Sequence, residues 1–219
     1  MFRSTRTLLL ASLIGVAVPL AMAPSAFAAG MGAGSGNAAM KAAPAMHVRG
    51  TIVSLDGSTL KVADLGGKTV AVALKSGWTV SGIKSASASD IRQGDFVGIA
   101  SVPGKSGSEA IEVLVFPKSM KGTGEGSYPW DAKPNSSMTN ATVAKMVKKV
   151  NARTLTLTYN GGQEKTITVP RNTPIVTVAP ATKADLTKGA HVFVPVKQAN
   201  GTLTAAHIVV GNNGVVPPM

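Results

Sequence analysis

Hydrophobic and polar residues alternate along most of the chain after residue 45, a pattern typical of β-strands that bury one face. In the first strand, Val48, Gly50 and Ile52 fall on one side. The alternation predicts five strands in the first unit, over 47–55, 59–64, 69–74, 95–102 and 109–116. Asp56-Gly57 is a hairpin signal between the first two strands. A single helical turn is predicted at 87–91, with Ser87 as its N-cap.

The same order of segments recurs 95 residues later. Thr59-Leu60 aligns with Thr154-Leu155, Gly66-Gly67 with Gly161-Gly162, and Asp90 and Gly94 with Asp185 and Gly189. The second unit is therefore predicted to have strands over 141–150, 154–159, 165–169, 191–197 and 202–210, with a helical turn at 181–186. Agreement at one fixed offset indicates two copies of one small β unit.

Three strands, a short helical element and two further strands are the order of the OB fold, a small five-stranded barrel. We therefore predict an all-β protein of two tandem OB-like barrels, over 46–117 and 141–211, followed by a tail at 212–219. A generic five-stranded barrel or an open sheet is the alternative.

The segment between the units, 118–140, is rich in Gly, Ser, Pro and Lys, which is typical of a linker. It nevertheless contains the aromatic residues Tyr128 and Trp130, followed by Asp131. We expect these three residues to dock in the groove between the barrels and fix their orientation. A ligand-contact role, with a ligand stacked on the rings, is the alternative.

Parts of this framework resemble a known family. Residues 50–54 read Gly-Thr-Ile-Val-Ser, residues 58–62 read Ser-Thr-Leu-Lys-Val, and residues 90–97 read Asp-Ile-Arg-Gln-Gly-Asp-Phe-Val. In these runs the chain resembles the secreted bacterial repeats of domain-of-unknown-function family 5666. The second unit departs from the pattern, because Ala190 replaces the acidic residue. The resemblance implies an OB-like barrel and export, and it implies no catalytic residues.

The amino-terminal residues have the pattern of a secretory signal peptide over 1–28. Arg3 and Arg6 precede an apolar stretch over 8–22, and Ala26-Phe27-Ala28 forms a small-x-small cleavage site. An amino-terminal membrane anchor is the alternative. Residues 29–45 lack hydrophobic periodicity and are predicted to be a disordered leader. The mature protein is therefore expected in the periplasm or outside the cell, without a transmembrane segment.

The absence of cysteine removes several kinds of chemistry. No cysteine occurs in the chain, so a lipid anchor on cysteine, disulfides, thiol catalysis and cysteine-bound zinc are excluded. Neither a Gly-x-Ser-x-Gly elbow nor a Ser/His/Asp set in a plausible order is present. We therefore expect no catalytic site.

The charge balance points to an anionic partner. Twenty-two Lys and Arg residues face ten Asp and Glu residues, giving +12, or +10 once Arg3 and Arg6 leave with the signal peptide. This favours lipopolysaccharide, anionic cell-wall polymers or nucleic acid, while solubility alone is the plainer interpretation. The middle strands carry only Tyr159 as a stacking aromatic, so specific nucleic-acid binding is not expected.

Metal handling is an alternative function. Strand alternation sends His191 and His207 to the outer face of the last hairpin, where they are predicted to be diagonal neighbours within about 7–8 Å. Such a pair can hold copper or zinc. Thioether ligands for Cu(I) are offered by the loosely spaced residues Met31, Met40, Met46, Met120, Met138 and Met146.

Together these patterns predict an exported, non-catalytic binding or structural protein of the cell envelope that contacts an anionic component or another periplasmic protein. No cofactor is expected, apart from a copper or zinc ion in the metal-handling alternative. A nonspecific oligonucleotide or polysaccharide binder is the second alternative.

Overall fold

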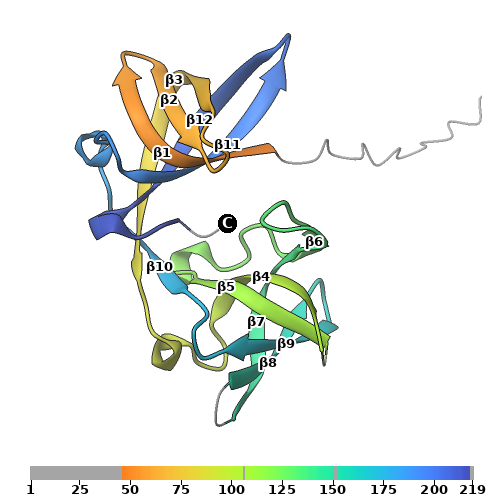
Figure 1. Cartoon of the computed structure of the whole chain (residues 1–219). Helices are drawn as coiled ribbons and strands as arrows, with labels where there is room; N and C mark the ends of the chain where they lie inside the picture. The colour runs from red at the N-terminus through yellow and green to blue at the C-terminus, as the bar shows by residue number, and fades with distance from the viewer. Residues whose placement is uncertain (1–45, 106, 150–151, 218–219) are drawn as a thin grey trace, which may run out of the picture. The chain divides into compact units, whose positions relative to one another are not determined.

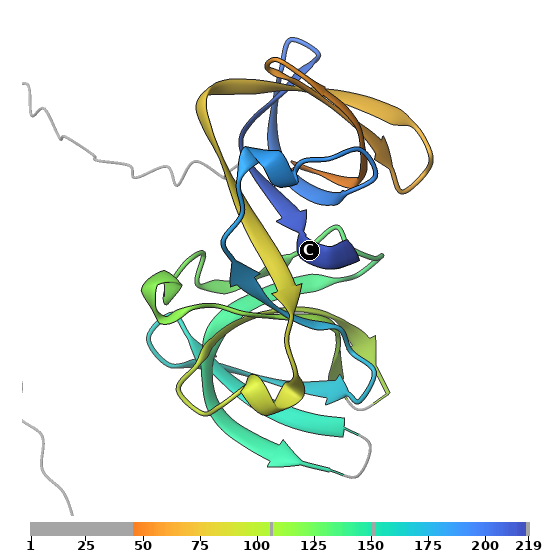
Figure 2. The same ribbon diagram turned by 90° about the vertical axis from the view of Figure 1, so that its left-hand side faces the viewer.

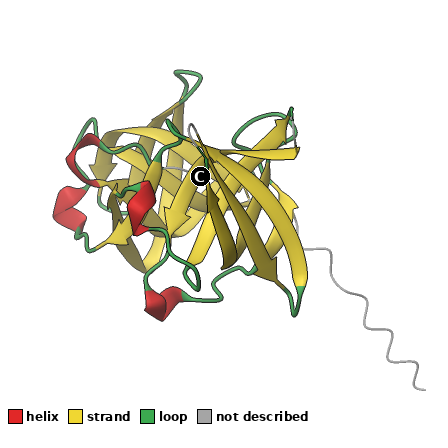
Figure 3. Ribbon diagram, turned by 90° about the horizontal axis from the view of Figure 1, so that it is seen from below, coloured by secondary structure: helices red, strands yellow, loops and turns green. Residues whose placement is uncertain are grey.

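The computed structural model describes residues 46–105, 107–149 and 152–217. The predicted signal peptide and leader lie outside the described residues. The elements are β1 (Met46–Asp56), β2 (Thr59–Asp64), β3 (Thr69–Ser85), η1 (Ala88–Asp90), β4 (Phe96–Gly104), β5 (Gly107–Val115), η2 (Lys118–Met120), β6 (Gly126–Pro129), β7 (Ser137–Lys148), β8 (Ala152–Tyr159), β9 (Gln163–Pro170), β10 (Ile175–Ala179), η3 (Lys183–Asp185), β11 (His191–Ala199), β12 (Thr202–Gly211) and η4 (Asn212–Gly214). The helical elements are single 3₁₀ turns outside the strands (Figure 3).

Five strands form a closed barrel in the order β12-β11-β1-β2-β3, because β3 also pairs with β12 in parallel (Figure 1). Alternate residues of these strands point inward, as Leu60 and Val62 do in β2 and Val192 and Val194 do in β11. This inward face forms one hydrophobic core. The prediction of an all-β fold with a closed five-stranded barrel is confirmed.

The other strands run in the order β5-β4-β7-β8-β9, and β6 adds to β7. The first and last of them pair at two positions, Ser108 with Ile167 and Glu109 with Thr168. A second hydrophobic core lies among these strands and includes Ile99, Leu155 and Leu157, none of which is exposed.

The two units exchange strands, so the prediction that 46–117 and 141–211 each close on themselves is wrong. In the described part of the chain, β1–β3 pair with β11 and β12, whereas β4 and β5 pair with β7 and β9. The cause lies in β3, which was expected to end at 74 but continues to Ser85. A strand of 17 residues is about 55 Å long, too long to stay within one small barrel.

The far end of β3 pairs with β10, where the chain crosses in the opposite direction (Figure 2). The pairing is antiparallel, from Gly82 opposite Ala179 to Ser85 opposite Val176. A third cluster of buried side chains is centred on this crossing and contains Ile83, Leu114, Val176, Phe193 and Val209. The crossing strands are therefore held by hydrogen bonds and by apolar burial.

The helical turns lie where the sequence predicts them. Ser87 and Asp90 form a capping box around η1, and Thr182 and Asp185 form the equivalent box around η3. The apolar residue after each turn enters a core, Ile91 with the strands around β7 and Leu186 in the closed barrel. Each turn therefore contributes one buried side chain at the end of a sheet.

The segment over 118–140 is more ordered than a linker. It contains η2 and β6, and β7 begins at Ser137, four residues before the predicted start. Strand β6 pairs with β7 over Gly126–Pro129, and the Asn140 side chain donates a hydrogen bond of 3.0 Å to the Tyr128 hydroxyl. None of the helices in the described residues has the length and apolar character needed to span a membrane.

Candidate anion-binding site

A cationic pocket lies where β7, β8 and β9 meet near η1. Its volume is about 240 Å³, and it is lined by Lys148, Lys149, Arg153 and Arg171, with Ala88, Ala152, Val169 and Pro170. None of these lining residues is acidic. We call this set the cationic pocket.

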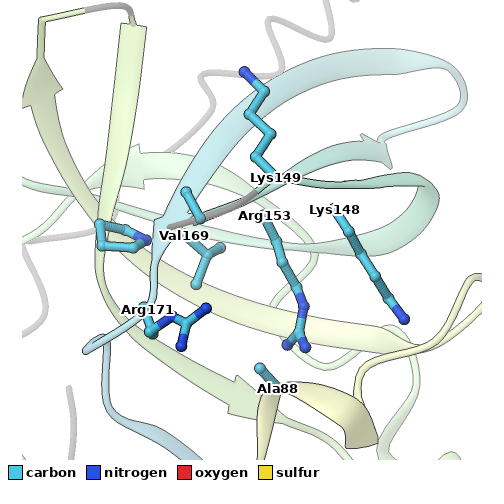
Figure 4. Close-up of a pocket in the computed structure, with 8 residues that line it drawn as sticks. Ala88, Lys148, Lys149, Arg153, Val169 and Arg171 are labelled. Carbon is cyan, nitrogen blue, oxygen red and sulfur yellow. The ribbon is translucent and has the colours of Figure 1, made fainter.

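Strand pairing brings the cations together. Lys148 at the end of β7 pairs with Arg153 in β8, and Arg153 pairs with Val169 in β9. Arg171 directly follows the last residue of β9. Figure 4 shows the guanidinium groups of Arg153 and Arg171 directed toward the same region beside Ala88, whereas the ammonium group of Lys149 points away from it.

One nitrogen in this pocket has no acceptor. Arg153 Nη1 is buried, and no atom of the described residues accepts a hydrogen bond from it. A buried donor without a partner costs about 1–3 kcal/mol, and more when the group is charged. An anion in the region toward which Arg153 and Arg171 are directed would remove this cost. The arrangement can therefore bind an oxyanion.

The first unit provides an internal comparison. The residues 95 positions before Lys148, Lys149, Arg153 and Arg171 are Val53, Ser54, Ser58 and Ser76, none of them charged. The counterpart of Ala88 is Lys183, whose ammonium group lies 4.1 Å from the centre of the Trp78 ring. The four cations of the pocket therefore have no charged counterparts in the first unit.

The sequence carried a signal for this pocket. Residues 145–153 read Lys-Met-Val-Lys-Lys-Val-Asn-Ala-Arg, four cations in nine residues. These four residues do not lie on one strand. The hairpin between β7 and β8 and the arrival of Arg171 from β9 create the cluster.

The segment 128–131 lies against β1 and β11. Asp131 accepts a hydrogen bond of 2.7 Å from Arg49 Nη2, and its other carboxylate oxygen lies 3.1 Å from His47 Nδ1. The Trp130 ring centre is 4.5 Å from that of His47 and 6.4 Å from that of Phe193. The structure thus brings Trp130 and Asp131 onto the closed barrel.

Tyr128 belongs to the same group of rings. Its ring centre lies 6.1 Å from that of Trp130, in an edge-to-face arrangement. The Arg49 guanidinium stacks 5.1 Å from the Phe193 ring centre and 5.7 Å from the Trp130 ring centre. These contacts are those of a docked segment, since its rings are engaged by neighbouring side chains.

Burial and neighbouring side chains shift the pKa values of Asp131 and His47. Burial raises the pKa of Asp131, but the hydrogen bonds from Arg49 and His47 outweigh it, so the pKa lies below its ordinary value. Burial lowers the pKa of His47, although the Asp131 carboxylate partly opposes this. The carboxylate is therefore held ionised beside the guanidinium.

The prediction that His191 and His207 are neighbours is wrong. Phe193 pairs with Val209, which places His191 at the level of Gly211, four residues from His207. Both His207 nitrogens contact hydroxyls of β3, at 2.8 Å to Thr79 and 2.9 Å to Ser81. A register shift between Phe193 and Lys197 breaks the alternation on which the prediction rested.

The outer face of this hairpin also differs from the prediction. By the same alternation Phe193 and Val209 would share the outer face with His191 and His207, but both are buried in the third cluster with Ile83 of β3 and Val176 of β10. Ala205 is buried in the barrel core.

The methionines that the structure describes have different surroundings. Met138 is buried in β7, Met146 packs on the second core, and Met46 is 43% exposed at the start of β1. Met31 and Met40 lie outside the described residues. Within 46–105, 107–149 and 152–217 no group of three or more His, Asp or Glu side chains is placed to hold a metal ion.

The histidines predict a pH dependence of stability. Burial lowers the pKa of both His47 and His207 below 6.5. As the pH drops, these histidines are therefore protonated in the unfolded chain at a higher pH than in the folded protein. The free energy of unfolding consequently falls as the pH drops from 7 toward 5. The slope is limited to about 1.4 kcal/mol per pH unit for each histidine. Urea denaturation across this range measures it.

His207→Gln keeps a hydrogen-bonding side chain beside Thr79 and Ser81 but removes the titrating group. We expect a shallower fall in stability between pH 7 and 5 than in the unmodified protein. Comparing each protein with its own value at pH 7 separates this effect from any loss of packing. Equal slopes would contradict the role given to His207.

No protein-family model, curated protein or solved structure gives a significant match to this chain. The resemblance to domain-of-unknown-function family 5666 stays a prediction.

Proposed function

We propose that this protein is an exported, non-catalytic binding protein of the cell envelope, and that it holds an anionic partner in the cationic pocket. The observation that carries the proposal is the buried Arg153 nitrogen without an acceptor, surrounded by further cations. Arginine presents a planar fork of donors that fits the oxygens of phosphate or carboxylate. A phosphate-bearing polymer or glycolipid of the envelope has this chemistry.

We further propose that the fold carrying this pocket consists of two OB-like repeats that have exchanged strands. A 3₁₀ turn followed by two strands occurs in both units, after β1–β3 in the first and after β7–β10 in the second, and η1 and η3 begin and end 95 residues apart, as do β4 and β11. This agreement supports an origin by duplication. The net charge of +10 on the predicted mature chain would draw an anionic partner toward the pocket.

The pocket is tested by titrating the mature protein with inorganic polyphosphate. Lys148→Gln combined with Arg153→Gln should weaken binding at least tenfold, or about 1.4 kcal/mol. Lys61→Gln combined with Lys75→Gln removes the same charge from exposed positions of the first unit and is the matched control. Equal weakening in the two double variants would show that binding follows net charge and not the pocket.

The envelope partner is tested by retention on isolated lipopolysaccharide and cell-wall fractions. We expect retention at low salt and release as salt is raised, because contacts between exposed charges are screened. The pocket double variant should be released at lower salt than the control variant. A mature protein that neither fraction retains at low salt would contradict the proposed partner.

A further inference from the structure

A second cavity, of about 590 Å³, lies between the loop that precedes β11 and the end of β12. It shares no residue with the cationic pocket. Its polar side chains come from the two chain segments 185–191 and 212–213, namely Asp185, Thr187, Lys188, His191, Asn212 and Asn213. We call it the polar cavity.

The polar side chains of this cavity are balanced in charge and in hydrogen-bonding type. The lining contains one carboxylate and one ammonium group, and the hydroxyl, the imidazole and the two amides supply both donors and acceptors. No Phe, Tyr or Trp and no large aliphatic side chain line it. Such a lining suits a neutral ligand with many hydroxyl groups, because an anion would meet Asp185 and an apolar ligand would leave the polar groups unpaired.

Several of these groups are held in place before any ligand arrives. Asp185 Oδ2 accepts hydrogen bonds from the Thr182 backbone nitrogen at 2.7 Å and from its hydroxyl at 3.0 Å. The Asn212 side chain donates to the Pro180 carbonyl at 3.4 Å. A lining fixed by the fold loses less entropy when a ligand binds.

The first unit has different residues at the positions equivalent to the wall of the polar cavity. The counterparts of His191 and Gly211 are Phe96 and Phe116, whose ring centres lie 5.3 Å apart. Phe96 is only 3% exposed, so these rings close the equivalent position in the first unit. At Gly211 no side chain can be added, because the carbonyl of Val215 occupies the place of a Cβ. Two phenylalanine rings of the first unit thus correspond to a histidine and a glycine that line the polar cavity in the second.

We propose that the polar cavity binds a neutral saccharide unit, as a site separate from the cationic pocket. An envelope polymer that carries both sugars and anionic groups offers ligands for both sites. The residues assigned to the saccharide are those of the polar cavity, with His191 at its wall.

The test is titration of the mature protein with the tetramer of β-1,4-linked N-acetylglucosamine at millimolar concentrations, followed by NMR. We expect saturable shifts of the His191 ring resonances. His191→Phe, which restores the residue of the first unit, should weaken binding at least tenfold. Asn213→Gly removes the side-chain amide, and glycine readily adopts the positive φ of 53° found at this position. This variant should weaken binding severalfold.

Arg153→Gln, in the cationic pocket, should leave saccharide binding unchanged, so the two proposals fail separately. Thermal unfolding of each variant confirms that the fold is retained. Absence of shifts in the unmodified protein would overturn the proposal. Binding of unmodified strength in both His191→Phe and Asn213→Gly would overturn it as well.

Discussion

Cleavage of the chain within the turn 121–124 leaves two fragments that remain together in native buffer. A protease site placed there separates β1–β5 from β6–β12. The fragments should elute as one species of unchanged size by gel filtration and separate only in denaturant. The reason is that each hydrophobic core contains strands from both fragments.

The ladders that join the fragments are extensive. Strand β1 pairs with β11 from Met46 to Thr51, β3 pairs with β12, and β4 pairs with β7 from Phe96 to Ser101. Separation would expose both cores and break these hydrogen bonds together. Two fragments that elute apart in native buffer would contradict the strand exchange.

Gly50→Ala is expected to destabilise the protein by about 3 kcal/mol. Gly50 lies in β1 between Asp64 of β2 and Val192 of β11, and an added Cβ would overlap the Ala63 carbonyl. The backbone must move to relieve this contact, and overpacking of this kind typically costs about 1–3 kcal/mol. Urea denaturation measures the change in the free energy of unfolding.

Gly57→Ala is the matched control. Gly57 has φ 58° in the turn after β1, and nothing lies within 4 Å of an added Cβ. Only the backbone conformation is strained, so the cost should be about 1 kcal/mol. A Gly50→Ala variant no less stable than Gly57→Ala would contradict the packing of β1 between β2 and β11.

The helical turns and most strand positions were predictable because they depend on local pattern, whereas β6, β10 and the second half of β3 were not predicted. The Asp56-Gly57 turn and the Ser87 and Asp90 capping box are set by neighbouring residues. The partner of each strand was not predictable. Two similar units offer equivalent inward faces, so alternation is satisfied equally by pairing within a unit or across units. The choice depends on β3 continuing to Ser85, where it pairs with β10.

The candidate sites were predictable only in part. The aromatic segment at 128–131 was visible because rings are rare in this chain, yet its partners Arg49 and His47 come from a strand about eighty residues away. The histidine pair failed because the turn pairs Ala199 with Thr202 and one extra residue then enters β12, so that His191 lies at the level of Gly211. A regular period of two shows neither feature. The cationic pocket depends on hairpin geometry that brings Lys148 opposite Arg153.

Anion binding at Arg153 is tested most directly by following the arginine side-chain NMR resonances during titration with inorganic phosphate. Arg153 should shift saturably, because its buried Nη1 gains an acceptor. The exposed Arg92, in the loop before β4, should shift little and without saturation. Saturable movement of Arg153 alone is the predicted result, and an unmoved Arg153, or equal unsaturated drift of both, would contradict it.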